Sequence, residues 1–451
     1  MSRIISKNFS RVEGNLSIKL EVIEDRVDKA YVSAGLYRGF ENILRNRNPL
    51  DALVIAPRIC GICSVAQSIA VALALNKATK TEFPENARLC MELMQACENI
   101  ADHLTHFYLF FMPDFTNSSY VERPWYSDVV RRFAANMQGE RGRKFLRARS
   151  NFLHIMGIIA GKWPHNIAIQ PGGMSKSVDM GEKIRLLGII DEFKLFIEEE
   201  FLGCTCEEMT SLQKIPEDNQ GDLGVFLRIA ATEKLYQYGR AYENYLCCED
   251  LLQADLKEDS YFAWFRTELS HPGMGQTLPE EGKDQAYSWA KAPRVSGLPY
   301  ETGAIARVLR QKQPLLTALV GENGGNIRER ILARALEIAI LLPKMRSLVT
   351  NINPNQSFNN PIKLEDEAEV YGLTEAARGV LGHWLVIHKG RIGNYQIITP
   401  TGWNFSPRDS QGIQGPLEKA LENILIQKEE IPVLAQHIIR SFDPCMACTV
   451  H

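Results

Sequence analysis

The chain has 451 residues, 45% of them hydrophobic and 23% charged, with a net charge of −3. This composition is typical of a soluble globular enzyme, and the lack of any Lys/Arg-rich run argues against nucleic-acid binding. No apolar stretch is long enough for a membrane span, and the first residues lack the apolar core of a signal peptide. We therefore expect a cytoplasmic protein, to which a partner could still supply an export signal.

Hydrophobic periodicity predicts a mainly helical α+β fold with small antiparallel hairpins. Hairpins are expected over residues 16–32 and 383–399. Helices are expected over residues 64–77, 85–111, 147–161, 183–201, 229–255, 303–308, 327–349 and 416–426. Loop-rich stretches cover residues 271–297, 357–364 and 402–415. Because no repeat, low-complexity tract or linker interrupts the pattern, residues 1–451 are predicted to form a single large compact domain.

Two Cys-x-x-Cys pairs, Cys60/Cys63 and Cys445/Cys448, lie near opposite ends of the chain. Four thiolates make a soft metal site, and here the fold must bring both ends together. Chain termini are usually frayed and replaceable, so a pair just before His451 indicates an end that is fastened inside the protein. Cys63 also leads directly into an expected helix, whose N-terminal dipole favours thiolate over thiol.

Several kinds of metal or redox site use Cys-x-x-Cys pairs, and each is a possible interpretation of these two. A structural zinc usually takes both pairs from a few dozen residues of a small domain, and a thioredoxin-type dithiol needs one pair in a βαβ context. A cubane iron–sulfur cluster is compatible with the ligand type. The other six cysteines show no ligand pattern and are expected to be buried as small apolar residues: Cys90, Cys97, Cys204, Cys206, Cys247 and Cys248.

The motifs around the cysteines distinguish between these kinds of site better than the number of cysteines does. They are Arg11–Gly14 (RVEG), Arg38–Glu41 (RGFE), Pro57–Cys63 (PRICGIC), Ala286–Arg294 (AYSWAKAPR), Glu375–Gly379 (EAARG), Pro400–Arg408 (PTGWNFSPR) and Asp443–His451 (DPCMACTVH). Together, and in this order along the whole chain, they resemble the large subunit of [NiFe]-hydrogenases. The resemblance implies the fold of that subunit and the oxidation of H2 to two protons and two electrons.

The resemblance also implies a Ni-Fe(CN)2(CO) centre on the four thiolates. Cys60 and Cys445 would be terminal ligands of nickel, and Cys63 and Cys448 would bridge nickel to an iron that carries CO and cyanide. Cys445 is expected to accept the proton of H2, since a terminal thiolate stays more basic than one shared by two metals.

Further site residues follow from the same motifs. Glu13 matches the carboxylate that relays the proton outward. Arg378, Asp102 and Asp443 match a charged canopy over the open face of the metals, in which the aspartates would balance a buried arginine. Thr401, the backbone of Pro400 and Arg378 match groups around an iron cyanide.

A second cation is implied beside the first centre. Glu41, the Ile397 carbonyl and His451 match the ligands of a magnesium, or another divalent cation, that locks the C-terminus in place.

The chain also departs from the family pattern. Gln67 and Asn15 stand where relatives carry His, and Ala377 replaces a Pro. Ile62 and Phe110 occupy gas-channel positions that usually hold smaller side chains. This combination resembles the regulatory, H2-sensing branch, with restricted access for O2. The alternative is an uptake enzyme that feeds electrons to a respiratory or soluble acceptor.

Both alternatives require a partner protein, because the sequence shows no further cysteine pattern for iron–sulfur clusters that could transfer the electrons. The resemblance implies an iron–sulfur small subunit, in a heterodimer or a dimer of heterodimers. A sensor would in addition report H2 to a histidine kinase.

Overall fold

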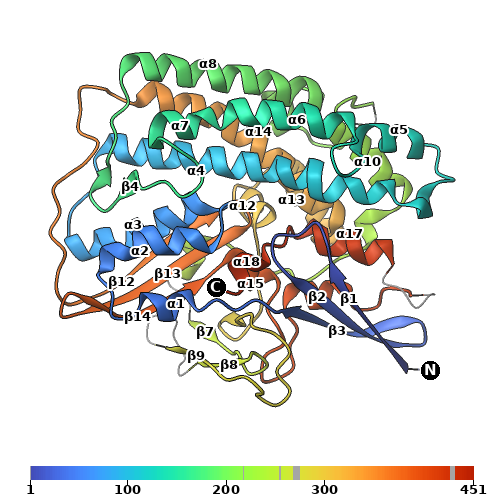
Figure 1. Ribbon diagram of the computed structural model, residues 1–451. Coiled ribbons are helices and arrows are strands. Elements are labelled where there is room, and N and C mark those ends of the chain that lie inside the picture. The colour runs from blue at the N-terminus through green and yellow to red at the C-terminus, as the bar shows by residue number, and fades with distance from the viewer. Residues whose placement is uncertain (1, 217, 253–254, 268–274, 427–431) are drawn as a thin grey trace.

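Long helices and small sheets occupy different sides of the molecule in the computed structural model, which describes residues 2–216, 218–252, 255–267, 275–426 and 432–451. In Figure 1 the helices α8, α14 and α4 stack above, the sheets lie below, and the C-terminus ends in the middle of the molecule. The predicted fold class, mainly helical with small antiparallel sheets, is confirmed.

The α-helices differ widely in length. They are α1 (Phe40–Leu44), α2 (Ala52–Ile55), α3 (Ser64–Thr79), α4 (Glu85–Thr105), α5 (Tyr126–Phe133), α6 (Glu140–Phe152), α7 (His154–Ala160), α8 (Met180–Phe196), α9 (Cys206–Ser211), α10 (Asp222–Thr232), α11 (Cys248–Leu251), α12 (Ala304–Arg310), α13 (Pro314–Asn323), α14 (Ile327–Asn351), α15 (Pro400–Asn404), α16 (Pro416–Leu421), α17 (Val433–Ser441) and α18 (Met446–Thr449).

Within the described residues, the strands form two three-stranded antiparallel sheets and several two-stranded ones. The larger sheets are β1 (Ser2–Phe9), β2 (Leu16–Ile23) and β3 (Arg26–Ala34), and β12 (Ala368–Ala376), β13 (Gly379–His388) and β14 (Arg391–Ile398). The short strands are β4 (Ile169–Gln170), β5 (Gly173–Met174), β6 (Tyr245–Leu246), β7 (Leu256–Glu258), β8 (Phe265–Thr267), β9 (Thr277–Pro279), β10 (Pro293–Val295) and β11 (Glu301–Thr302). Of these, β6 and β11 pair in parallel.

The centre of the core is the pair α4 and α14. In α4, Leu89, Leu93, Ala96, Ile100 and Leu104 repeat at helical spacing and are all buried, so one continuous face packs against neighbouring helices. The helix continues into a π-helical turn, η3 (His106–Phe111). This packing fixes the position of α4, the helix that carries Asp102, one of the predicted site residues.

The helix that follows Cys63 lies directly on a sheet. Helix α3 packs against β12, and the approach is so close that a Cβ at Gly372 would lie 1.9 Å from the Ala70 carbonyl oxygen. Only glycine fits there. This contact fixes the start of α3 relative to the rest of the protein.

Most predicted elements are found, with shifted ends. The expected helix over residues 229–255 is wrong, because α10 ends at Thr232. Lys234 and Gly239 adopt positive φ angles of 52° and 83°, which a continuing α-helix does not allow. Each predicted hairpin gains a third strand, β1 or β12. The expected loop over residues 271–297 contains β9 and β10, and its first four residues lie outside the described part.

Among the described residues, no helix combines the length and apolar character needed to cross a bilayer.

Candidate metal centre

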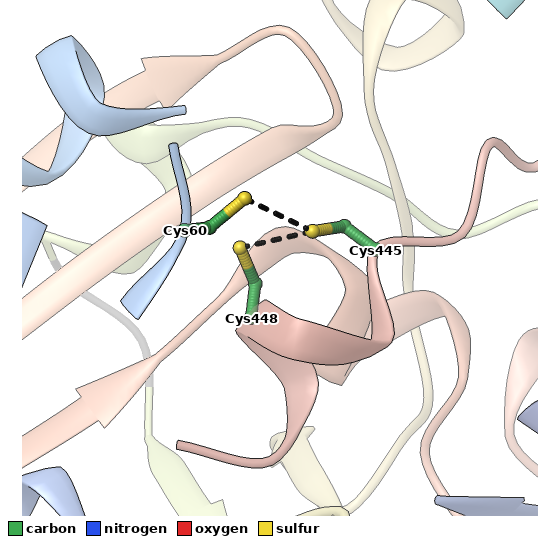
Figure 2. A group of neighbouring side chains, drawn as sticks. All are labelled: Cys60, Cys445 and Cys448. Atoms are coloured by element: carbon green, nitrogen blue, oxygen red, sulfur yellow. Dashed lines mark hydrogen bonds between the residues drawn. The ribbon is translucent and has the colours of Figure 1, made fainter. Parts of the chain in front are cut away.

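The two cysteine pairs meet in the interior. The Sγ atoms of Cys60 and Cys445 are 3.5 Å apart, those of Cys63 and Cys448 are 3.1 Å apart, and those of Cys445 and Cys448 are 3.2 Å apart. Figure 2 shows Cys448 on α18 and Cys445 just before it, with both sulfurs turned toward Cys60 on a separate segment. The expected convergence of the two ends is therefore present in the structure.

All four sulfurs are withdrawn from solvent, which makes four separate negative charges impossible without a cation. Hydrogen bonds from the other thiols hold the pKa of Cys60 well below its usual range. The same crowding raises the pKa values of Cys63, Cys445 and Cys448 above that range. A soft metal would replace these shared protons, because metal ligation takes thiolates.

The N-terminal pair is held by a helix. Cys63 is the N-cap residue of α3, as the sequence predicts. The N–H groups of Val65 and Ala66 in its first turn donate to Glu98.

The C-terminal pair is held by main-chain contacts. The Glu13 carbonyl accepts hydrogen bonds from the N–H groups of Met446 (2.7 Å) and Ala447 (3.4 Å). Gly14 adopts φ 82°, and a Cβ there would lie 2.7 Å from the Ala447 nitrogen, so only glycine permits this approach. The Cys445 N–H also donates to Thr401 Oγ1 at 3.1 Å.

One arginine connects the two cysteine segments. Arg38 Nη2 donates to the carbonyl of Ile59 at 2.8 Å and to that of Ala447 at 2.5 Å. These carbonyls lie immediately before Cys60 and Cys448, so a single guanidinium fixes one segment to the other.

The predicted canopy residues lie together at the cysteines. Arg378 donates to the Asp443 carbonyl and to Asp443 Oδ1, both at 2.9 Å, and its Nη1 lies 2.7 Å from Asp102 Oδ2. Burial raises the pKa of Asp102 to about 7 although Arg378 opposes the rise. Burial also acts to raise the pKa of Asp443, but Arg378, His106 and Arg334 together outweigh it, and the pKa is lowered.

The side chain of Glu13 is half-buried, and the backbone of Glu13 forms a bridge with Cys445. Burial and the charge of Cys60 raise the pKa of this carboxyl, while Arg378 and Arg38 oppose the rise. A carboxyl that readily holds a proton beside a thiolate suits proton transfer.

The three residues expected to bind a divalent cation also converge. His451 Nε2 lies 3.4 Å from Glu41 Oε1, and the Ile397 N–H donates to the same oxygen at 2.6 Å. The ammonium group of Lys291 contacts Glu41 and donates to the Ile397 carbonyl at 3.0 Å. Although burial opposes ionisation, Lys291 and His451 lower the pKa of Glu41 to about 2. The position attracts positive charge, and Lys291 already supplies some of it.

The two predicted gas-channel residues are placed differently. Ile62 lines a cavity of about 10 Å³ beside Cys63, Cys445 and Cys448, which is about the space that one water needs. Phe110 lies on η3, where its carbonyl accepts a hydrogen bond from Arg11 at 2.9 Å. Among the described residues, Phe110 is not part of the lining of that cavity.

Of the residues that depart from the family pattern, Gln67 joins a buried network. Its Oε1 lies 2.8 Å from His383 Nε2, and His383 Nδ1 lies 2.7 Å from the Tyr395 hydroxyl. Asn15 is exposed, and the Ala377 carbonyl accepts from Arg307 at 3.0 Å.

The structure adds buried polar residues that sequence reasoning missed. Arg307 pairs with Glu337 at 2.6 Å and donates to the carbonyls of Ala376 and Ala377, so it holds the segment that carries Arg378. Glu98 lies one helical turn before Asp102, and burial raises its pKa to about 8. For Glu98 the signal was an acid whose neighbours at helical spacing, Met91, Met94 and Ala101, are apolar. Arg307 had no such signal.

Comparison with known proteins decides the family. The model of the family described as "Nickel-dependent hydrogenase" matches residues 38–123 and 143–451. The chain belongs to the nickel-dependent hydrogenase family. It is 29% identical to the periplasmic [NiFeSe] hydrogenase large subunit of Desulfomicrobium baculatum, over 98% of this chain and 93% of that one. It is 27% identical to the quinone-reactive Ni/Fe-hydrogenase large chain of Wolinella succinogenes, over 100% and 96%.

A solved structure agrees over the full length. The Ni-Fe-Se hydrogenase of D. vulgaris Hildenborough in the reduced state superposes with a TM-score of 0.85 at 27% identity, covering 100% of both chains. The protein is therefore a hydrogenase large subunit that oxidises H2. The four converging buried thiols are the donor set that a nickel–iron centre requires, so the residues present fit the cofactor.

Proposed function

We propose that the four cysteines hold a Ni-Fe(CN)2(CO) centre at which H2 is split heterolytically, and that the protein acts as an H2 sensor with restricted access for O2. The observation that supports metal binding most directly is the set of three sulfur contacts of 3.1 to 3.5 Å among residues from both ends of the chain. When bound, nickel and iron supply the Lewis-acid and redox chemistry for two electrons.

The protein's own residues manage the protons. With the metals bound, Cys445 would accept the first proton from H2, and Glu13, whose carbonyl accepts hydrogen bonds from the same segment, would relay it outward. Arg378 and Asp102 line the cavity, and the ion pairs of Arg378 with Asp102 and Asp443 keep charge fixed in a dry site. Pro400 and Thr401, which line the cavity, are the groups proposed to receive a cyanide.

The sensor role is supported by the narrow cavity that Ile62 lines. It requires an iron–sulfur small subunit as electron acceptor and a histidine kinase as reader of the signal, and we propose a cytoplasmic location. The cation proposed at Glu41, Ile397 and His451 is Mg²⁺, for which oxygen donors are typical. Its binding would require the Lys291 ammonium to share or leave those oxygens.

The second candidate is an uptake enzyme. A relative named as quinone-reactive favours it, because such a protein passes electrons to a respiratory acceptor. This role needs the same site and the same small subunit, but a high turnover.

Metal analysis of the full chain with its co-purified partner tests the site. We expect nickel and iron in stoichiometric amounts, and stoichiometric zinc in active protein would overturn the proposal. Turnover then separates the two roles: slow H2 oxidation together with a bound kinase supports the sensor, and fast reduction of a quinone or soluble acceptor supports uptake.

A further inference from the structure

Helix α3 lacks the usual cap at its start, although it begins directly at a proposed metal ligand. The first N–H groups of any helix have no partner within the helix, and a Ser, Thr, Asp or Asn side chain at the N-cap commonly accepts from them. The N-cap of α3 is Cys63, which makes no such bond. Its sulfur lies 3.1 Å from Cys448 instead.

The missing acceptors come from another helix. Glu98 of α4 is only 3% exposed. Its Oε2 accepts from the Val65 N–H at 2.9 Å, and its Oε1 accepts from the Ala66 N–H at 3.0 Å. Oε2 also accepts from the indole N–H of Trp163 at 3.0 Å. Both oxygens are thus used, and the side chain cannot turn without breaking several bonds.

Glu98 also lies at the site itself. It lines the same small cavity as Cys63, Asp102 and Arg378. Since α4 carries both Glu98 and Asp102, one rigid helix positions the start of α3 and one acid of the canopy.

We propose that Glu98 is the positioning residue for Cys63: it caps α3 from outside, so that the cysteine at the N-cap is free to turn its sulfur to the metals. The inference rests on the proposed function, in which Cys63 is a bridging ligand. Without this cap, the first turn of α3 would fray, and the thiolate of Cys63 would lose its fixed direction.

The first test needs no metal. Amide hydrogen exchange at Val65 and Ala66 is measured in the unloaded full chain. In Glu98→Gln the amide keeps one acceptor oxygen and turns an NH2 group toward a donor, so exchange should accelerate on the order of tenfold. Trp163→Phe removes only the indole donor and should leave exchange near the parent rate. The matched control is Glu92→Gln, an exposed residue of α4 that pairs with Lys344 at 3.1 Å. Unchanged exchange in Glu98→Gln would overturn the inference.

The second test separates positioning from simple stability. In the metal-loaded complex, the infrared CO and cyanide bands report electron density at the iron to which Cys63 would be bound. Glu98→Gln should shift these bands, and Glu92→Gln should not. Bands at the parent frequencies in Glu98→Gln would contradict the inference while leaving the proposed function intact. A parent protein without nickel and iron would overturn both.

Discussion

The two Cys-x-x-Cys pairs share a motif but are held in different ways. Cys60 and Cys63 precede a helix of 16 residues that lies against a sheet and α4. Cys445 caps and Cys448 lies within a helix of four residues near the end of the chain, held by contacts from Glu13, Thr401 and Arg38. Both pairs lie in one buried cluster, but a long helix positions the first, and the second belongs to a strap, Asp443–His451, that several distant residues fasten.

This difference assigns separate tasks to the two halves of the site. A core helix gives a precise and permanent position to half of the ligands. A four-residue helix held by a few contacts is expected to open at lower free energy than a long core helix, so we expect the strap to be the half of the site that opens first. The largest effects are expected where a sulfur itself is lost.

Cys63→Ser and Cys448→Ser should each abolish metal retention and H2 oxidation together, because a hydroxyl is a poor ligand for a soft metal. Nickel and iron content by elemental analysis, together with H2-dependent dye reduction, checks this. Cys90→Ser is the control, since Cys90 is buried in α4 and is not among the cysteines of the candidate metal group in the described residues. Retained nickel and iron in either ligand variant would contradict the assignment.

Glu13 tests whether the strap also serves catalysis. Glu13→Gln keeps the backbone carbonyl that holds Met446 but cannot relay a proton, so the site should assemble while turnover falls on the order of 10²-fold. H2/D2O exchange and metal content are measured together, with the exposed Glu24→Gln as control. An unchanged exchange rate would remove Glu13 from the proton path.

His451 tests how firmly the strap is fastened. It is 4% exposed, its Nδ1 lies 2.8 Å from the Cys448 carbonyl, and its Nε2 faces Glu41. Deletion of His451 should loosen Cys448 and lower metal loading several-fold without unfolding the core. Glu41→Gln should act in the same direction, and the double variant should lose less than the sum, because the two residues act through one contact. Additive losses would separate Glu41 from the strap.

Sequence reasoning succeeded where a pattern is local. Helical spacing predicted α3 and α4; beyond local patterns, the family resemblance predicted that Arg378, Asp102 and Asp443 lie together. It failed where tertiary partners decide. The strand β12 (Ala368–Ala376) was missed because its partner β13 and the helix that covers it supply its stability.

The missed buried residues show the same limit. No spacing indicates that Glu98 caps a helix that starts more than 30 positions earlier, or that Lys291 contacts Glu41. Such side chains are tolerated in the core only because distant groups satisfy them, and those groups are known only once the fold is known.

The smallest effect in the absence of oxygen is expected at the gas-channel residues. Ile62→Val with Phe110→Leu removes methylene-sized volumes, and gaps in a packed apolar wall tend to remain as cavities. H2 is smaller than O2, so widening a bottleneck changes access for O2 more. The double variant should keep its anaerobic H2 oxidation and lose activity in air. Because Ile62 lines the cavity at the thiolates and Phe110 lies on η3 outside its described lining, Ile62→Val alone should account for most of the loss. Rates of inactivation in air for both single variants check this order. Air survival equal to the parent in the double variant would place oxygen protection at the metals or in the partner subunit, and not in the passage.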